Sequence, residues 1–223
     1  MSILKKVLVV LVVIVVGVIA FAATRPDSYR VERSQKIQAP AAVVFAQLDD
    51  FKAWQAWSPW EKRDPNMKKT YEGPARGAGA SYAWQGNDKV GEGKMTITDA
   101  TAPTAISYRL EFIKPFASVA ATTFTLQPDG DKAANVTWAM SGDNNLIGKV
   151  FGVFMNMDKM IGGDFETGLA GLKSVSEAEA AKAEAAAAAA EAAKAQAQAQ
   201  AAAAPAPAAP PPASPAPPAK KKK

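Results

Sequence analysis

The residues that could carry out acid–base or nucleophilic chemistry belong to only a few types. The 223 residues include no cysteine and no histidine. Thiol nucleophiles, imidazole bases, disulfides and zinc sites built on these ligands are therefore excluded. Asp, Glu, Tyr, Lys and Arg remain, and among these Tyr82 and Tyr108 are candidate hydrogen-bond donors to a bound carbonyl group.

The carboxylates show no spacing that would force two of them together. Asp99 ends a predicted strand, and Glu92 stands between two glycines at a turn. Arg109 and Glu111 alternate with apolar residues, so their side chains are predicted to point away from the core. We therefore expect no catalytic constellation, no cofactor and no metal, and we regard enzymatic activity as an open but less favoured hypothesis.

An unbroken apolar run near the amino end predicts a membrane anchor over residues 1–24. Val7–Ala23 follows Lys5 and Lys6 and is closed by Arg25-Pro26. As a helix this run would reach roughly 26 Å, which is close to the thickness of a bilayer core. The alternative is a cleaved signal peptide, because Ala20-Phe21-Ala22 offers small residues in a cleavage-like arrangement, but the run is longer than the usual apolar region of such peptides.

The charges that flank the apolar run help to predict on which side of the membrane the domain lies. Lys5 and Lys6 favour an amino end inside the cell, whereas Arg25, Arg30 and Arg33 on the other flank reduce that bias. We expect a single-pass protein of the cell (inner) membrane with its domain on the periplasmic side.

The remaining chain divides into three zones by composition. Residues 25–175 have the apolar content and turn residues of one globular domain, and they are nearly neutral although the whole chain carries +5. Residues 176–204 are rich in alanine and predict a helical spacer, and residues 205–223 are rich in proline and alanine and predict a disordered tail. The tail ends in Lys220, Lys221, Lys222 and Lys223, which could contact an anionic surface or serve only solubility. We expect no specific nucleic-acid binding.

Within residues 25–175, periodicity of two predicts about six strands and periodicity of three to four predicts helices. The expected strands are residues 29–37, 81–85, 94–99, 106–112, 122–126 and 135–140. Two short helices are expected after the first strand, and the second of these contains Phe51, Trp54 and Trp57. An apolar stripe over residues 145–175 predicts a terminal helix, with a break or a kink at Gly162-Gly163. This order indicates an α+β fold in which an antiparallel sheet packs on the terminal helix.

Local sequence within this order resembles known proteins. The stretches in question are Val31-Glu32-Arg33-Ser34, Ile37-Gln38-Ala39-Pro40, Trp54-Gln55-Ala56-Trp57-Ser58-Pro59-Trp60, Asp64-Pro65-Asn66-Met67, Gly91-Glu92-Gly93-Lys94-Met95 and Asp164-Phe165-Glu166-Thr167-Gly168-Leu169. They are similar to membrane-anchored bacterial members of the SRPBCC superfamily, which includes START-like lipid-transfer domains and polyketide cyclase/dehydrase-like proteins. The resemblance covers roughly residues 29–175 and implies the helix-grip fold, a curved sheet around the terminal helix with a cavity between them.

The resemblance also implies which side chains would line that cavity. The candidates are Trp54, Trp57, Trp84, Tyr108, Phe112, Trp138, Met140, Phe154, Met157 and Phe165. Aromatic rings and thioethers suit a flat or chain-like apolar ligand, although the same residues could simply fill the core.

Three functional hypotheses follow from this reading. The favoured one is a membrane-anchored binding protein for a hydrophobic small molecule or lipid. The alternatives are a non-catalytic adaptor or scaffold whose tail contacts a partner or an anionic envelope surface, and a polyketide cyclase/dehydratase-like enzyme.

Overall fold

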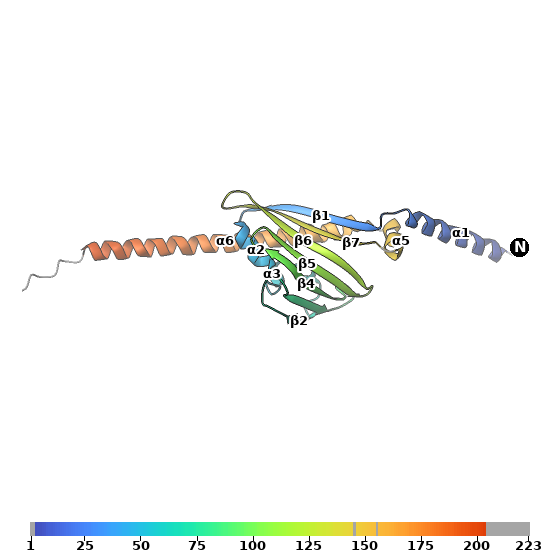
Figure 1. Cartoon of the computed structure of the whole chain (residues 1–223), viewed down its shortest axis with the longest axis horizontal. Helices are drawn as coiled ribbons and strands as arrows, with labels where there is room; N and C mark the ends of the chain where they lie inside the picture. The colour runs from blue at the N-terminus through green and yellow to red at the C-terminus, as the bar shows by residue number, and fades with distance from the viewer. Residues whose placement is uncertain (1–2, 145, 155, 204–223) are drawn as a thin grey trace, which may run out of the picture. The chain divides into compact units, whose positions relative to one another are not determined.

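The computed structural model of the chain describes residues 3–144, 146–154 and 156–203 (Figure 1). The helices are α1 (Ile3–Ala23), α2 (Ala41–Leu48), α3 (Trp54–Trp57), α4 (Pro59–Arg63), α5 (Leu146–Phe154) and α6 (Met157–Ala203). The strands are β1 (Ser28–Ile37), β2 (Lys68–Glu72), β3 (Ser81–Gln85), β4 (Glu92–Thr101), β5 (Ala105–Lys114), β6 (Ser118–Pro128) and β7 (Ala134–Asp143).

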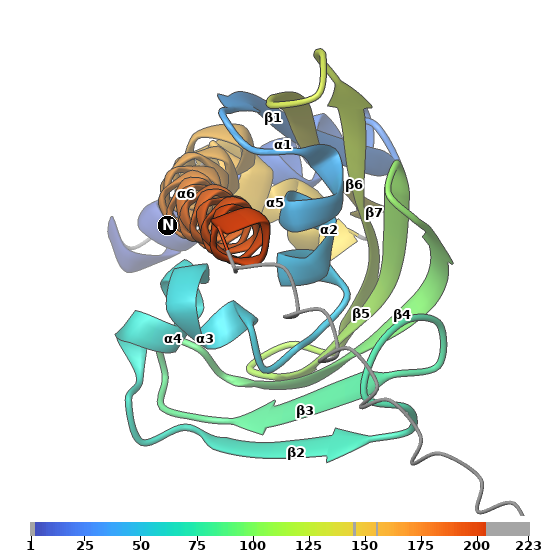
Figure 2. The ribbon, with the colours of Figure 1, turned by 90° about the vertical axis from the view of Figure 1, so that its left-hand side faces the viewer.

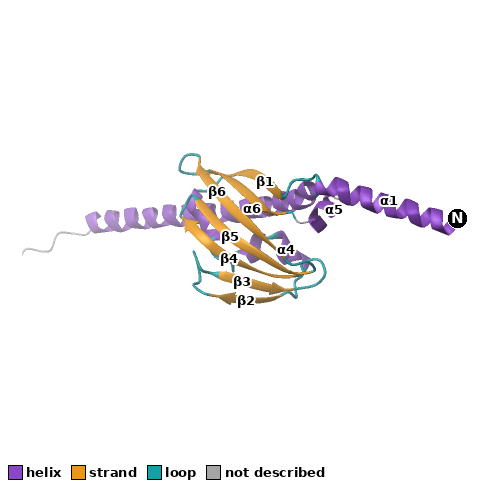
Figure 3. Cartoon of the chain, turned by 45° about the vertical axis from the view of Figure 1, so that its right-hand side comes forward, coloured by secondary structure: helices purple, strands orange, loops and turns teal. Residues whose placement is uncertain are grey.

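The strands form one antiparallel sheet in the order β1-β7-β6-β5-β4-β3-β2. Strands β2 to β7 follow one another as a meander, and β1 pairs with β7 along its whole length. Figure 2 shows the sheet curving around α6, with α2, α3 and α4 on the same concave side, and Figure 3 shows the strands as one continuous layer. This is the helix-grip fold that the sequence predicted.

The sheet has seven strands, one more than the expected six, and the additional strand is β2. Four of its five residues are exposed, and Lys69 is half-buried. A strand at the edge of the sheet with no buried face has no apolar alternation, which is why periodicity did not reveal it.

The sequence predicted a break or a kink at Gly162-Gly163, and the break is wrong, because α6 runs through both glycines. The interruption lies earlier, between α5 and α6. Gly162 instead permits a close contact, since a Cβ atom there would lie 2.0 Å from Nη2 of Arg33. Arg33, on β1, reaches across this glycine to bond Asp158 at 3.0 Å and Glu166 at 2.7 Å. The packing and ion pairs at this point offset the roughly 1 kcal/mol by which glycine disfavours a helix.

Helix α6 covers the concave face with the apolar stripe that the sequence predicted. Phe165, Leu169 and Leu172 are almost completely buried. The buried stripe continues past residue 175, since Ser176 is fully buried and Ala180 packs against the core.

The chain forms two units, residues 1–182 and residues 183–223. The described part of the second unit is the alanine-rich end of α6, whose side chains are exposed wherever they are described. The predicted proline-rich tail, residues 205–223 with its four lysines, lies outside the described residues.

Helix α1 has 21 residues, a mean hydropathy of 3.0 and almost no buried surface. Among the described helices it is the one that is long and apolar enough to cross a membrane, and a signal sequence would have the same properties. Residues 24–27 separate the end of α1 from the start of β1.

Candidate functional site

A cavity of about 380 Å³ lies between the sheet, the α3–α4 segment and α6. Its size falls within the range of small-molecule sites. Most of its wall is apolar. The buried apolar residues of the wall are Trp54, Met67, Tyr82, Trp84, Met95, Trp138, Met140 and Phe165. Side chains from β3, β4, β7 and α6 thus leave a space that they do not fill.

The cavity opens at one end of the sheet. The exposed residues of its wall lie in the β3–β4 turn and beside the β5–β6 turn, and they are Asp88, Lys89, Lys114, Pro115 and Ser118. Pairing of Glu92 with Lys114 brings these two turns together. Strand β1 starts at this same end, and its Tyr29 also lines the cavity.

Stacked and hydrogen-bonded aromatic rings fix the shape of the wall. Phe165 of α6 stacks on Trp138 of β7, with ring centroids 4.1 Å apart and an interplanar angle of 8°. The indole N–H of Trp138 donates to Thr122 at 3.1 Å, and that of Trp84 donates to the carbonyl of Val90 at 3.0 Å. These bonds satisfy the indole N–H groups within the protein, so neither N–H group requires a ligand as its acceptor.

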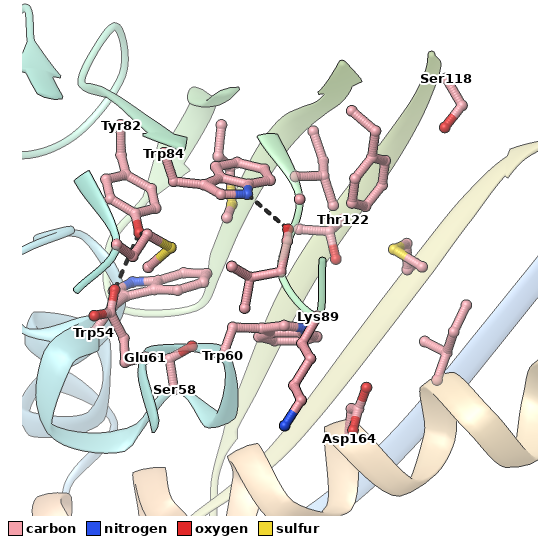
Figure 4. A pocket seen from close by; sticks show the side chains of 18 of the residues that line it. Trp54, Ser58, Trp60, Glu61, Tyr82, Trp84, Lys89, Ser118, Thr122 and Asp164 are labelled. Atoms are coloured by element: carbon pink, nitrogen blue, oxygen red, sulfur yellow. Dashed lines mark hydrogen bonds between the residues drawn. The ribbon is translucent and has the colours of Figure 1, made fainter. Parts of the chain in front are cut away.

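One buried carboxylate lies in the wall, as Figure 4 shows. Glu61 belongs to α4, a short helix that starts at Pro59, and its side chain is 8% exposed. The hydroxyl of Tyr82 donates to Oε1 of Glu61 at 3.1 Å, and Lys69 of β2 forms an ion pair with Oε2. We call Glu61, Tyr82 and Lys69 the polar cluster of the cavity.

The surroundings of Tyr82 favour its protonated form. Burial, followed by the nearby negative charge of Glu61 and the hydrogen bond to it, raises the pKa of Tyr82 well above its usual value. The hydroxyl therefore remains a hydrogen-bond donor at neutral pH and is not a base.

A second ion pair lies on the α6 side of the cavity. Arg63, the last residue of α4, pairs with Asp164 of α6, and Asp164 lines the cavity. This pair connects the short helices to the terminal helix across the wall.

The predicted site residues fall into three groups. Six of them line the cavity, namely Trp54, Trp84, Phe112, Trp138, Met140 and Phe165. Trp57 and Tyr108 do not line it. Phe154 and Met157 belong to the described helices, but the structure does not describe their side chains.

Trp57 and Tyr108 are instead part of the packed core next to the cavity. Trp57 is 1% exposed, with its ring edge-on to Phe124 at 6.1 Å. The hydroxyl of Tyr108 donates to the carbonyl of Leu48 at 2.9 Å, so it is already engaged. The ring of Trp54 packs against both, with centroid distances of 4.7 Å to Trp57 and 5.4 Å to Tyr108.

Sequence reasoning missed Glu61, Lys69, Met67, Met95 and Leu110, all of which belong to the cavity or its polar cluster. Tyr82 was predicted as a possible donor to a bound carbonyl group, and its hydroxyl donates to Glu61 in the structure. One signal was present, since Glu61 directly follows Trp60 in a segment of apolar aromatic residues. Its partner Lys69 could not be found, because it lies on the strand that periodicity did not reveal.

Solved structures with this fold support the architecture. A solution structure from Thermobifida fusca is 20% identical over 66% of this chain and 92% of its own, with a TM-score of 0.51. The Zhui aromatase/cyclase from Streptomyces sp. R1128 is 12% identical over 67% of this chain and 94% of its own, also with a TM-score of 0.51. A hypothetical protein from Helicobacter pylori is 9% identical over 66% of this chain and 88% of its own, with the same TM-score. At these identities the likeness concerns the fold.

Sequence comparison identifies the family. No curated protein matches significantly. The family described as "Polyketide cyclase / dehydrase and lipid transport" matches residues 28–177, which includes every described strand and the first 21 residues of α6. The chain therefore belongs to the polyketide cyclase/dehydrase and lipid transport family, of SRPBCC type.

Proposed function

We propose that this protein binds a hydrophobic small molecule or lipid in the cavity and is held at a membrane by α1. The observation that carries the proposal is the open apolar cavity of about 380 Å³ between the sheet and α6. A space of this size inside a domain whose other rings are closely packed forfeits dispersion contacts unless a ligand supplies them. Trp84, Met95 and Phe112 give it the flat and deformable walls that suit an apolar ligand.

The position of the cavity mouth supports a ligand drawn from a membrane. The mouth is at the end of the sheet where β1 starts, and residues 24–27 are all that separate β1 from α1. Four extended residues span about 14 Å. If α1 crosses the bilayer, the mouth is therefore held near the lipid headgroups. We place the protein in the cell (inner) membrane with the domain on the periplasmic side, and protease accessibility in intact spheroplasts tests this placement.

A cavity-filling variant tests ligand binding. Leu110 lines the cavity, and its neighbour Arg109 is exposed on the opposite face of β5. We expect full-length protein purified from its host to carry an apolar ligand in native mass spectrometry. Leu110→Trp should lose that ligand because the indole occupies its space, whereas Arg109→Trp should keep it.

Two results would count against this function. One is wild-type protein that is always ligand-free and also fails to take up added fatty acids, phospholipids and aromatic polyketides. The other is equal ligand content in the Leu110→Trp and Arg109→Trp proteins.

A further inference from the structure

The cavity has one position that differs chemically from the rest of its wall. Glu61 places a carboxylate among Trp54, Trp60 and Met67, and its side chain is 8% exposed. Burial of an ionised group is costly unless hydrogen bonds or opposite charges compensate it. Such a group in a ligand cavity therefore constrains which ligand groups can lie next to it.

The described partners of Glu61 leave part of its acceptor capacity unused. Oε1 accepts a hydrogen bond from Tyr82, and Oε2 pairs with Lys69. A carboxylate can accept about four hydrogen bonds, so both oxygens can take a further donor. Lys69 is not among the residues of the cavity wall, and it approaches from β2, so the ligand would meet Glu61 and Tyr82 and not the ammonium group.

We propose that Glu61 selects ligands that are neutral and carry a hydroxyl or N–H donor on an apolar body, and that it disfavours ligands carrying a carboxylate. This inference deepens the proposed function and rests on it. The donor group would bind the free acceptor positions of Glu61 while the apolar body lies along Trp84, Met95 and Phe112. An anionic group at the same place would lie nearer to the carboxylate of Glu61 than to the ammonium group of Lys69, which is outside the wall, so repulsion by the nearer like charge disfavours it in a medium of low dielectric constant.

A purely structural ion pair makes a different prediction. Lys69 and Glu61 also connect α4 to β2, and that connection alone would affect stability without affecting the choice of ligand. Ligand selectivity is therefore the quantity to measure, and unfolding temperature serves as the check on folding.

Three probes with the same aromatic body separate these cases: naphthalene, 2-naphthol and 2-naphthoate. Their binding to the full-length protein in lipid nanodiscs can be followed at pH 7 by quenching of tryptophan fluorescence, because Trp54, Trp60 and Trp84 line the cavity. Control nanodiscs without protein correct for partitioning into lipid. We expect 2-naphthol to bind at least about tenfold more tightly than 2-naphthoate, as one hydrogen bond to a charged group allows.

Glu61→Gln removes the charge and keeps the shape, so we expect it to reduce the preference for naphthol over naphthoate to less than about threefold. The matched control is Glu72→Gln, which makes the same change at a side chain that is 62% exposed and paired with Lys94. The control should retain the wild-type preference.

Tyr82→Phe is a second variant that leaves Glu61 and Lys69 in place. It frees one acceptor position on Glu61, so naphthol should bind as well as to wild type or better. Abolished naphthol binding in Tyr82→Phe would overturn the assignment to Glu61, because the tyrosine would then be the recognising group.

The failure of this inference is distinguishable from failure of the proposed function. Naphthalene bound by wild type, with the same ranking of the three probes in wild type and Glu61→Gln, overturns the selectivity and leaves the apolar binding site intact. Failure of wild type to bind any of the three probes contradicts both.

Discussion

The space between the sheet and its helices has two halves built from the same kinds of residue, and one is full while the other is hollow. In the packed half, Trp57 and Tyr108 each lie edge-on to Phe124 at a centroid distance of 6.1 Å. In the hollow half, Trp84 lies edge-on to Phe112 at 6.2 Å beside the cavity. Edge-on aromatic pairs with nearly the same ring spacing are therefore present in both halves.

The difference lies in what faces the rings. The end of α2 and the residues of α3 fill the packed half, where the carbonyl of Leu48 accepts hydrogen bonds from both Trp54 and Tyr108. Toward the mouth, α6 contributes Ile161, Asp164 and Phe165 to the wall, and these leave the space open. A cavity in this fold thus depends on where the short helices end, and less on which apolar residues the strands carry.

The largest expected contrast comes from the same substitution in the two halves. Leu48 is fully buried in the packed half, so Leu48→Ala should cost about 2–5 kcal/mol of unfolding free energy, because it creates a new void. Leu110 is half-buried and already borders the cavity, so Leu110→Ala should cost about 1 kcal/mol. Unfolding followed by tryptophan fluorescence measures both, and equal losses would mean that the hollow half is packed in solution.

A smaller contrast is expected from the two tyrosine hydroxyls. Tyr108→Phe removes a buried hydrogen bond, yet Leu48 still accepts from Trp54, so the loss should be about 1 kcal/mol. Tyr82→Phe should cost about 0.5 kcal/mol, because Lys69 still compensates Glu61. Tyr108→Phe should leave the affinity for naphthol unchanged, and an effect of this variant on naphthol affinity would contradict the boundary between the halves.

The smallest effect concerns the ion pairs that hold α6 to β1. The hydrogen bond and charge of Arg33 lower the pKa of Asp158, so the ionised carboxylate is favoured in the folded state. A lowered folded pKa gives stability that is present above the unfolded pKa, about 4, and is lost as the pH falls through the folded value. The difference in unfolding temperature between wild type and Arg33→Met should therefore be constant from about pH 7 to 5 and shrink below about pH 4.

The matched control for this pH dependence is Arg30→Met, on the same strand. Arg30 pairs with Glu32 two residues away and makes no described contact with α6. For Arg30→Met, the difference in unfolding temperature from wild type should not change below about pH 4. If this difference shrinks at low pH in both variants, the net charge of the protein, and not the contact of Arg33 with α6, sets the pH dependence.

The sequence predicted most of the architecture because each part of it is local. Alternation along Ile106–Phe112 marks a strand with one buried face, and the stripe through Phe165, Leu169 and Leu172 marks the covering helix. Where a residue's role depended on a distant partner, local reasoning failed. The glycine pair predicts a break or a kink in the helix, whereas in the structure Gly162 admits the side chain of Arg33 from a strand more than a hundred residues earlier.

The amino-acid sequence alone was sufficient for the apolar amino-terminal helix, for six of the seven strands and for the exclusion of histidine and cysteine chemistry, since these follow from composition and from periods of two and 3.6 residues. Which aromatic residues border an empty space became known from the folded arrangement, because an apolar residue gives the same sequence pattern whether its neighbour is a side chain or a cavity. The tertiary structure alone also joined Glu61, Tyr82 and Lys69, which come from three elements and meet only when the sheet curves over α4.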